Sequence, residues 1–334
     1  MKNNPLVYSL ALTTAFLWNG GELFAQRTTE NASPRILKSQ KKGQIAPTQF
    51  LKLVNDSSGN PRSLQTSITR YQSNDLLVDL IAVIHIGEKQ YYKKLDHQFS
   101  QYQSLLYELV APENHRVPTQ AERANSSSNP LRMIQGTMQN MLGLHSQLEH
   151  IDYSKKNFVH ADLSPTQIKR KLEDRGETPW TFAFKAFGEL MQNQNSPAAE
   201  SLSQDIQSFD QLFSMMSDST KLKRMLAKQF TAGGAMEMGL GKSLNQLLID
   251  DRNEAAMRVL REEVRDGKTR LALFYGAAHM PDFEKRLTSE LGLRKTRQAW
   301  VEAWDLKRST NSRAKDPVNS IADMLFQLLD EASK

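Results

Sequence analysis

The hydrophobic pattern of the chain centres on an aliphatic run that ends at a histidine. The run extends from Leu76 to Ile84, is rich in Val and Ile, and predicts a strand covered on both faces inside a sheet. His85 follows it directly. From Glu88 to Ser100 the apolar residues recur at helical spacing, which predicts a helix with one buried face. A second apolar run, Leu105 to Val110, predicts another short strand, so this segment is expected to form a strand, a helix and a strand.

A similar pattern returns near the end of the chain. Leu271–Tyr275 predicts a short strand, the small residues Gly276–Ala278 interrupt it, and His279 precedes Pro281. A proline in this position is typical of the first turn of a helix, which is expected over 282–291. A histidine therefore closes a predicted strand twice in this sequence.

His85, Glu108 and His279 are the principal candidates for a functional site. Ligands of open α/β sheets bind beyond the carboxyl ends of the strands, where these three residues are expected. Two imidazoles and one carboxylate can bind a divalent metal ion and leave positions open for water and substrate. Such an ion lowers the pKa of its water to about 7 and polarises a carbonyl group, so the set favours hydrolysis. A single histidine at a strand end is commonly a capping or core residue, but two in matching contexts, together with an acid, favour a site.

A long helix predicted over Lys242–Asp266 points a charge at the core. Its apolar stripe consists of Leu244, Leu248, Ala255, Ala256, Val259 and Leu260. Arg252 falls on the same face. Burial of an unpaired guanidinium group is costly, so Arg252 is expected to meet Glu108 or a bound anion, and Asn253 can hydrogen-bond to the same centre. The alternative is a purely structural Arg–Glu pair that holds the helix to the sheet.

The remaining pattern predicts an α/β (α+β) fold with a central mixed sheet, whose βαβ units carry histidines at strand ends. A β-hairpin is expected over 50–71 and a further strand over 298–304. The segment between the two histidine units, about 131–266, is expected to be a large helical insertion. Within it a short extended piece at 158–162 precedes a helix capped by Ser164. Helices are predicted at 131–150, 180–192, 206–216 and 222–230, and near the C-terminus at 318–329.

Four other residues are weaker site candidates. His160 has some claim because Asp162 lies two residues further on the same face of an extended segment. A solvated loop pair is the expected explanation for these two residues. His145 and His150 carry no pattern of their own.

The N-terminus has the layout of a secretory signal peptide. An apolar run from Leu6 to Trp18 follows one lysine, and Ala25 offers a small residue for cleavage. The run is shorter than the about 20 residues that cross a membrane comfortably, although an uncleaved anchor is the alternative. The predicted organisation is a signal peptide (1–25), a disordered leader (26–47), one domain (48–306), and a linker with a C-terminal helix (307–334). A secreted or periplasmic protein is expected, with a membrane contact only through the signal segment.

Composition and charge exclude several classes of protein. The 334-residue chain has no cysteine, which excludes a lipoprotein anchor, a disulfide framework, a thiolate metal site and a cysteine nucleophile. Its formal net charge is only +6, and Lys and Arg are scattered among acids. A nucleic-acid partner is therefore not expected.

Five short motifs together resemble the TraB/GumN family, which includes the TIKI proteases. They are Ala82-Val-Ile-His85, Tyr107-Glu108-Leu109, Phe158-Val-His-Ala-Asp162, Asp251-Arg252-Asn253 and Gly276-Ala-Ala-His279. The family pattern is a pair of Gly-x-x-His motifs with an intervening Glu and a later Arg-Asn. Ala82 departs from it, since the first motif has Gly there. The likeness extends over about 76–304.

The resemblance implies an erythromycin-esterase-like α/β architecture and hydrolysis of a peptide or protein substrate with manganese or cobalt, zinc being possible. His85 and His279 would be metal ligands or bases, and Glu108 a ligand or general base. Arg252 and Asn253 would be the catalytic stabilisers. Two alternatives remain open: a non-enzymatic protein that binds and sequesters a peptide or haem, and a metal-independent esterase that uses a histidine as base.

Overall fold

The computed structural model describes residues 47–111, 142–178, 181–182, 185, 218–231 and 245–307. The predicted signal peptide, nearly all of the leader, the predicted helix at 206–216 and the C-terminal helix lie outside these ranges, as does almost all of the helix predicted at 180–192. Within the described residues no helix has the length and apolarity needed to span a lipid bilayer.

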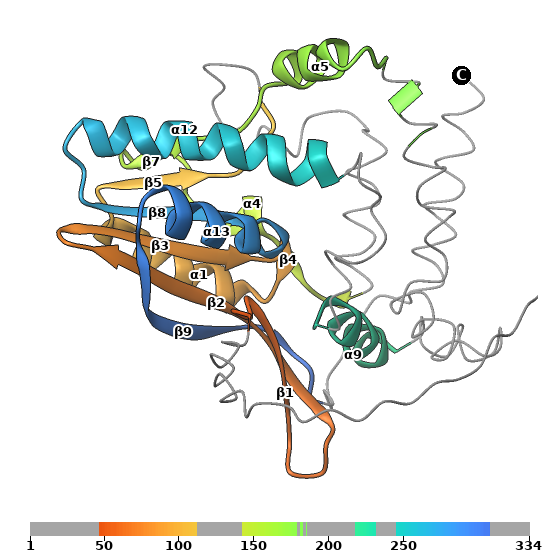
Figure 1. The fold of residues 1–334 in the computed structure, drawn as a ribbon. Helices are drawn as coiled ribbons and strands as arrows, with labels where there is room; N and C mark the ends of the chain where they lie inside the picture. Colours follow the sequence, from red (N-terminus) through yellow and green to blue (C-terminus); the bar gives the residue numbers. More distant parts are fainter. Residues whose placement is uncertain are drawn as a thin grey trace, which may run out of the picture. The chain divides into compact units, whose positions relative to one another are not determined.

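A seven-stranded mixed sheet forms the centre of the described fold, as the hydrophobic pattern predicted (Figure 1). Its strands are β1 (Leu51–Asn55), β2 (Pro61–Ser73), β3 (Leu76–Val83), β5 (Ser104–Tyr107), β7 (Phe158–His160), β8 (Arg270–Gly276) and β9 (Arg294–Asp305). The strand order is β1-β2-β3-β8-β5-β7, with β9 paired to β2. A separate two-stranded sheet joins β4 (Ile86–Gly87) to β6 (His145–Ser146).

Strand β3 lies inside the sheet and is covered on both faces, which explains its aliphatic sequence. Ile81 and Val83 pack in one hydrophobic cluster with α1 (Lys89–Gln98). Alternate residues of the same strand pack in a second cluster with α12 (Asp251–Arg265) and α13 (Met280–Glu290). Successive strand residues point to opposite faces, so this alternation places helices on both sides of the sheet (Figure 1).

The long strand β2 joins the antiparallel half of the sheet to β3. A two-residue turn, Asn74–Asp75, connects β2 to β3, and Asn74 has a positive φ of 48°. Tight turns of this kind favour asparagine, which tolerates the left-handed conformation better than most residues. Strands β1, β3 and β9 all pair antiparallel with β2.

Strands β3, β8, β5 and β7 form the parallel half of the sheet. Strand β8, from the far end of the chain, lies between β3 and β5 and pairs parallel with both. Strand β7 pairs parallel with β5 at the edge. All four strands therefore end at the same side of the sheet, and this side is where ligands of such sheets bind.

The segment predicted as a helical insertion is not purely helical. Strand β7 belongs to the main sheet, and β6 pairs with β4 within the range predicted as the helix 131–150; the short helix α4 (Gln147–His150) follows β6. Two further helices, α5 (Pro165–Asp174) and α9 (Ser219–Gln229), agree with the sequence prediction. Ser164 caps α5 in a capping box with Gln167, as its sequence indicated.

A wide helical turn at Gln246–Asp250 precedes α12 and corrects the predicted apolar stripe. Leu248 was expected to face the core, but it is 38% exposed, whereas Leu247 and Ile249 are buried. A π-type turn contains an extra residue, so the residues before it do not continue the face of the α-helix that follows. Such turns are frequent at functional sites.

Candidate functional site

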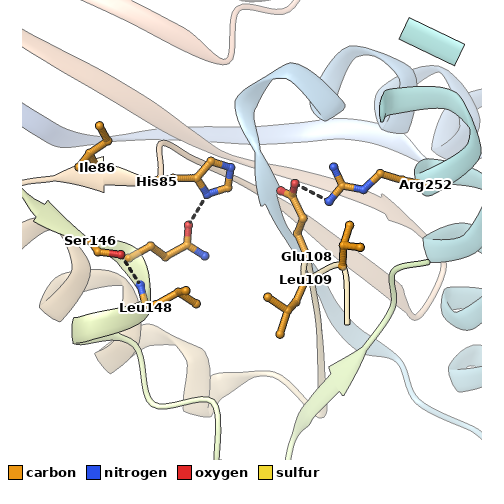
Figure 2. A pocket seen from close by; sticks show the side chains of 9 residues that line it. His85, Ile86, Glu108, Leu109, Ser146, Leu148 and Arg252 are labelled. Carbon is orange, nitrogen blue, oxygen red and sulfur yellow. Dashed lines mark hydrogen bonds and ion pairs between the residues drawn. The ribbon is translucent and has the colours of Figure 1, made fainter. Parts of the chain in front are cut away.

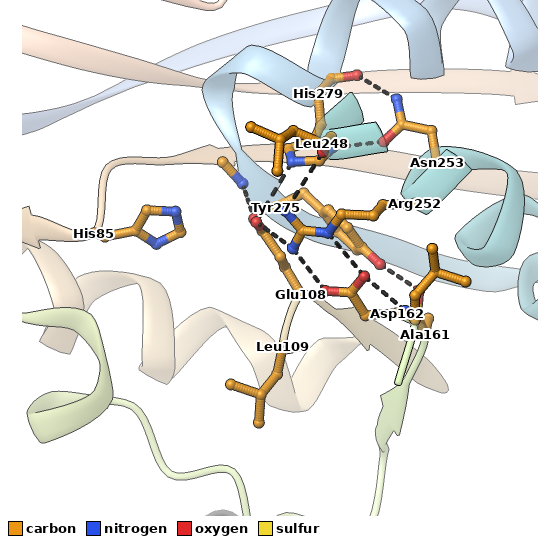
Figure 3. A network of polar contacts seen from close by, with 12 residues as sticks. His85, Glu108, Leu109, Ala161, Asp162, Leu248, Arg252, Asn253, Tyr275 and His279 are labelled. Carbon is orange, nitrogen blue, oxygen red and sulfur yellow. Dashed lines mark hydrogen bonds and ion pairs between the residues drawn. The ribbon is translucent and has the colours of Figure 1, made fainter. Parts of the chain in front are cut away.

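Each of the four parallel strands places a polar side chain at the same edge of the sheet. His85 follows β3, Glu108 follows β5, Asp162 follows β7, and His279 follows β8 in a short 3-10 turn. Arg252 comes from the first turn of α12 and hydrogen-bonds to Glu108 and Asp162 (Figure 3). The three principal residues predicted from the sequence therefore converge, although they are far apart in the chain.

Gly276 lies at the point where His85, Glu108 and His279 meet. A methyl group added to Gly276 would lie 3.3 Å from Glu108 Oε2, 3.4 Å from His85 Nε2 and 3.6 Å from His279 Cδ2. Only a residue without a side chain leaves this space open. The Gly of the second predicted motif thus forms the floor between the three side chains.

Glu108 contacts three polar groups of the site. Its Oε1 accepts a hydrogen bond from Arg252 Nη2 at 2.7 Å and lies 3.4 Å from His279 Nε2. Its Oε2 accepts from the backbone N–H of Gly276 at 2.6 Å. Burial by itself would raise the pKa of Glu108, but His279, His85 and Arg252 together hold it well below the ordinary value. Glu108 is therefore an ionised carboxylate at neutral pH.

Asn253 sets the tautomer of His279. The Asn253 Nδ2 donates to the carbonyl of His279 at 3.0 Å and to Asp282 Oδ2 at 2.9 Å, and both of these groups are acceptors. Its Oδ1 therefore faces His279 Nδ1, at 2.6 Å, and this nitrogen carries the proton. The Nε2 of His279 is left directed at Glu108.

Gln147 holds His85 in the same way. The Gln147 Nε2 donates to the Tyr153 hydroxyl at 2.7 Å, so its Oε1 accepts from His85 Nδ1 at 2.9 Å. The backbone N–H of Gln147 also donates to the carbonyl of His85. Both imidazoles of the site thus carry Nδ1–H and present Nε2, the arrangement that outer hydrogen-bond partners impose on metal-binding histidines.

Arg252 bridges two carboxylates, and its main partner is not the one expected. Asp162 accepts from Arg252 Nε at 2.9 Å and from Nη2 at 2.7 Å, while Glu108 accepts from Nη2 alone (Figure 3). The side chain of Asp162 is fully buried and that of Arg252 is 12% exposed. Burial would lower the pKa of Arg252, but the hydrogen bonds and charges of Asp162 and Glu108 raise it further above its already high value. The guanidinium group is therefore permanently charged.

A pocket of about 220 Å³ opens over this network (Figure 2). His85 and Glu108 lie on opposite sides of it, and Arg252 also contributes to its wall. The remaining wall is mostly apolar and is formed by Ile86, Leu109, Val110, Ser146, Gln147 and Leu148. Val110 is 42% exposed, and with Leu248 it is one of the two large exposed hydrophobic residues in the described part of the chain.

The weaker candidates are separated by the structure. His160 Nε2 bonds to the carbonyl of Leu109 at 2.6 Å, and its ring packs on Tyr107. Asp162 points instead to Arg252, so the expected solvated pair of His160 and Asp162 is wrong. Strand β7 ends at His160 and the chain bends at Asp162, so the strand alternation on which that prediction relied does not extend to Asp162.

Two residues have roles that the sequence did not reveal or placed differently. Asn253 was expected beside Arg252 at the reacting centre, but it is fully buried and its Oδ1 contacts Nδ1 of His279; neither residue lines the pocket. Gln147 was not predicted at all. No local pattern marks it, because its contact with His85 joins segments that are 62 positions apart.

The described residues include one compact group that could hold a metal ion, and it is not the predicted one. One ligand atom from each of His145, Glu149 and His150 lies within 4.8 Å of the others. His85, Glu108 and His279 do not meet this spacing as a set of three, although Glu108 and His279 do so as a pair. No metal identity follows from either group.

Comparisons with protein-family models, with curated proteins and with solved structures find no match to this chain. Membership of the TraB/GumN family stays a prediction that rests on the motifs themselves.

Proposed function

We propose that this protein is a hydrolase of peptides that uses a divalent metal ion held by His85, His279 and Glu108. One observation carries the proposal: two imidazoles and an ionised carboxylate from three separate strands converge on the space above Gly276. Both imidazoles are fixed in the Nδ1–H form, so their Nε2 atoms are directed at that space. Donor types and directions fit a divalent ion, and His85 would have to approach the other two.

The residues of the site would have different roles in the hydrolysis of a peptide bond. When bound, a divalent ion supplies Lewis acidity and lowers the pKa of a water molecule to about 7. Glu108 acts as a ligand rather than as the general base, because a carboxylate with a depressed pKa is a weak base. His85 and His279 would both be ligands through Nε2, and neither could also act as the base, because Nδ1 of each already carries a proton. Arg252, held by Asp162, stabilises the negative charge that develops on the substrate carbonyl.

The proposed substrate class rests on the family resemblance and on the pocket. A peptide has the carbonyl that such a centre attacks. The apolar wall, which includes Ile86, Leu109 and Leu148, suits an apolar side chain next to the bond that is cleaved. Manganese or cobalt is the ion that the resemblance favours, with zinc as an alternative.

Metal-free hydrolysis with His85 as the base is the second candidate, and a specific contact favours it. Arg252 Nη2 already donates a hydrogen bond to Glu108 Oε1 and places a positive charge beside this oxygen. A cation at this distance from a ligand carboxylate weakens the attraction of the site for a second cation. In this version Glu108 and Arg252 form the charged pair, and Nε2 of His85 takes up the proton of the attacking water.

The test compares metal content and peptide turnover in three forms of the full chain. Wild type, His85→Ala/His279→Ala and Glu108→Gln are treated with a chelator, reloaded with Mn²⁺, Co²⁺ or Zn²⁺, and assayed on a mixed peptide library. Turnover is expected only after reloading, and both variants should lose it by at least about 100-fold. The exposed His97→Ala is the matched histidine control.

Three other results would overturn the proposal. Wild-type turnover that persists in chelator supports the metal-free alternative with His85 as base. Turnover retained by His85→Ala/His279→Ala removes these residues from the reaction. Peptide binding by wild type with no turnover for any ion supports the non-enzymatic alternative.

A further inference from the structure

His145, Glu149 and His150 form a second polar cluster, on the rim of the pocket. Strand β6 supplies His145 and the short helix α4 supplies the other two. Residues between them, Ser146 to Leu148, belong to the pocket wall. The cluster is therefore attached to the candidate active site but is not part of its reacting centre.

The geometry of the cluster is that of a site for a small cation. One ligand atom from each of the three side chains lies within 4.8 Å of the other two, and His145 Nδ1 is 3.9 Å from Glu149 Oε2. The rings of His145 and His150 meet edge to face, with centroids 4.9 Å apart. Zinc binds nitrogen and oxygen at about 2.0–2.2 Å, so two ligands on one ion lie about 3.4 Å apart. Side-chain rotations alone can close the small difference.

An unsatisfied nitrogen gives an independent reason to expect a ligand. His150 Nε2 is buried and has no hydrogen-bond partner, the only such side-chain atom among the residues that the structure describes. A buried polar atom without a partner is costly, and in native proteins it commonly marks an ion or water. His150 is therefore able to offer this nitrogen to an ion.

The charged side chains around the cluster have opposite effects on a bound cation. Lys89 and Lys93 of α1 repel a cation here, as they disfavour a charged His150, whereas Glu149 attracts one. The side chains of His145 and Glu149 are 43% and 35% exposed, so an ion can reach them from solvent. The site should therefore bind reversibly and not as a permanent structural centre.

We propose that His145, Glu149 and His150 bind a zinc-type divalent ion. The bound ion holds α4 in place and, with it, Gln147, which orients the imidazole of His85. Two imidazole nitrogens and one carboxylate oxygen suit zinc, cobalt or nickel and not calcium or magnesium, which require more oxygen ligands. The coupling follows from the backbone. Gly87 pairs with His145, Ile86 pairs with Ser146, and the Gln147 N–H donates to the carbonyl of His85 at 2.9 Å. The inference concerns ion binding and does not depend on hydrolysis.

The test is a zinc titration of the full chain in a His85→Ala/His279→Ala background, which removes the central histidines. Calorimetry should find one bound Zn²⁺ per chain at the rim. Adding His145→Ala/His150→Ala should weaken this binding by at least about 100-fold, since changes to outer partners alone cost 10–100-fold. Adding Glu149→Gln should weaken it less, and adding His97→Ala should leave it unchanged.

Amide hydrogen exchange at Gln147 measures the coupling in the same background, because the carbonyl at position 85 remains. At a zinc concentration about 100 times Kd, exchange of the Gln147 N–H should slow by up to about 100-fold. In the variant that also carries His145→Ala/His150→Ala, zinc should not slow this exchange. If His145→Ala/His150→Ala and Glu149→Gln each change the zinc affinity by less than threefold, the proposed zinc site is wrong. Zinc binding without slower exchange at Gln147 would overturn the coupling.

Discussion

Each charged residue of the site is balanced by two or more partners. Glu108 is shared by Arg252, His279 and the N–H of Gly276, and Arg252 is shared by Glu108 and Asp162. Buried ion pairs of this kind contribute little net stability, because desolvation offsets the attraction, but loss of one member leaves an uncompensated charge. The network therefore holds side chains in place more than it stabilises the fold.

Glu108→Gln should change how stability depends on pH. The folded-state pKa of Glu108 is depressed, so its contribution to the free energy of unfolding is present above about pH 4.5 and is lost as pH falls through the lower folded-state pKa. At neutral pH the variant should be less stable by about 1.5–3 kcal/mol, the value of a hydrogen bond to a charged group. Below about pH 4.5 the two curves should converge. Urea unfolding across this range measures the difference.

The exposed Glu302→Gln in β9 is the matched control for that measurement. It should follow the wild-type curve. If Glu108→Gln also runs parallel to wild type at every pH, the carboxylate is not held by the partners described.

At the scale of the elements, α5 and α12 are held together beside the site. Asp251, at the start of α12, is buried and forms ion pairs with Lys171 of α5 and with Arg175, the C-cap residue of α5. Asp162 lies two residues before Ser164, the N-cap of α5, and Arg252 lies in α12. The Asp162–Arg252 pair therefore depends on two helices that are themselves linked.

Ser164→Ala should destabilise α5. The Ser164 hydroxyl accepts from the Gln167 N–H at 3.2 Å, and the Gln167 side chain accepts from the Ser164 N–H at 2.8 Å. Loss of such a cap costs about 1 kcal/mol. Ser164→Asp, which retains an acceptor at this position, should recover most of the loss. Equal stability of Ser164→Ala and wild type in urea would contradict the capping role.

At the scale of the whole molecule, the last described strand joins the antiparallel half of the sheet to the segment that follows His85. Strand β9 pairs with β2 along most of its length. Trp304 is 1% exposed, its Nε1 donates to the carbonyl of Ile86 at 2.7 Å, and its ring meets Phe230. Strand β9 thus supports the segment that follows His85.

Trp304→Ala should be among the most destabilising single changes. A fully buried Trp replaced by Ala costs about 3–5 kcal/mol because it leaves a cavity. Trp300→Ala in the same strand is the matched control. Trp300 is half-buried, and Lys52 Nζ lies 4.3 Å from its ring centroid, an interaction of about 1 kcal/mol. Thermal or urea unfolding should rank the two variants in this order, and equal losses would contradict the central position of Trp304.

Most of the described elements could be predicted from the sequence. Strand β3, helix α1, strand β8 and the capped start of α5 follow from local periodicity and capping residues, which depend on neighbours in the chain. Candidate residues at strand ends follow from the same pattern. The face of α12 was predicted correctly from Arg252 onward, but the wide turn at 246–250, which leaves Leu248 exposed, could not be read from the spacing of apolar residues.

The amino-acid sequence by itself determined which segments become strands or helices and that histidines close two of the strands. Tertiary structure decided that β8 lies between β3 and β5, that Asp162 is the main partner of Arg252, and that Gln147 and Asn253 orient the two imidazoles. The reason is physical. Hydrophobic periodicity records whether a side chain is buried, whereas strand order and the choice of hydrogen-bond partner depend on contacts between segments far apart in the chain, which no local pattern encodes.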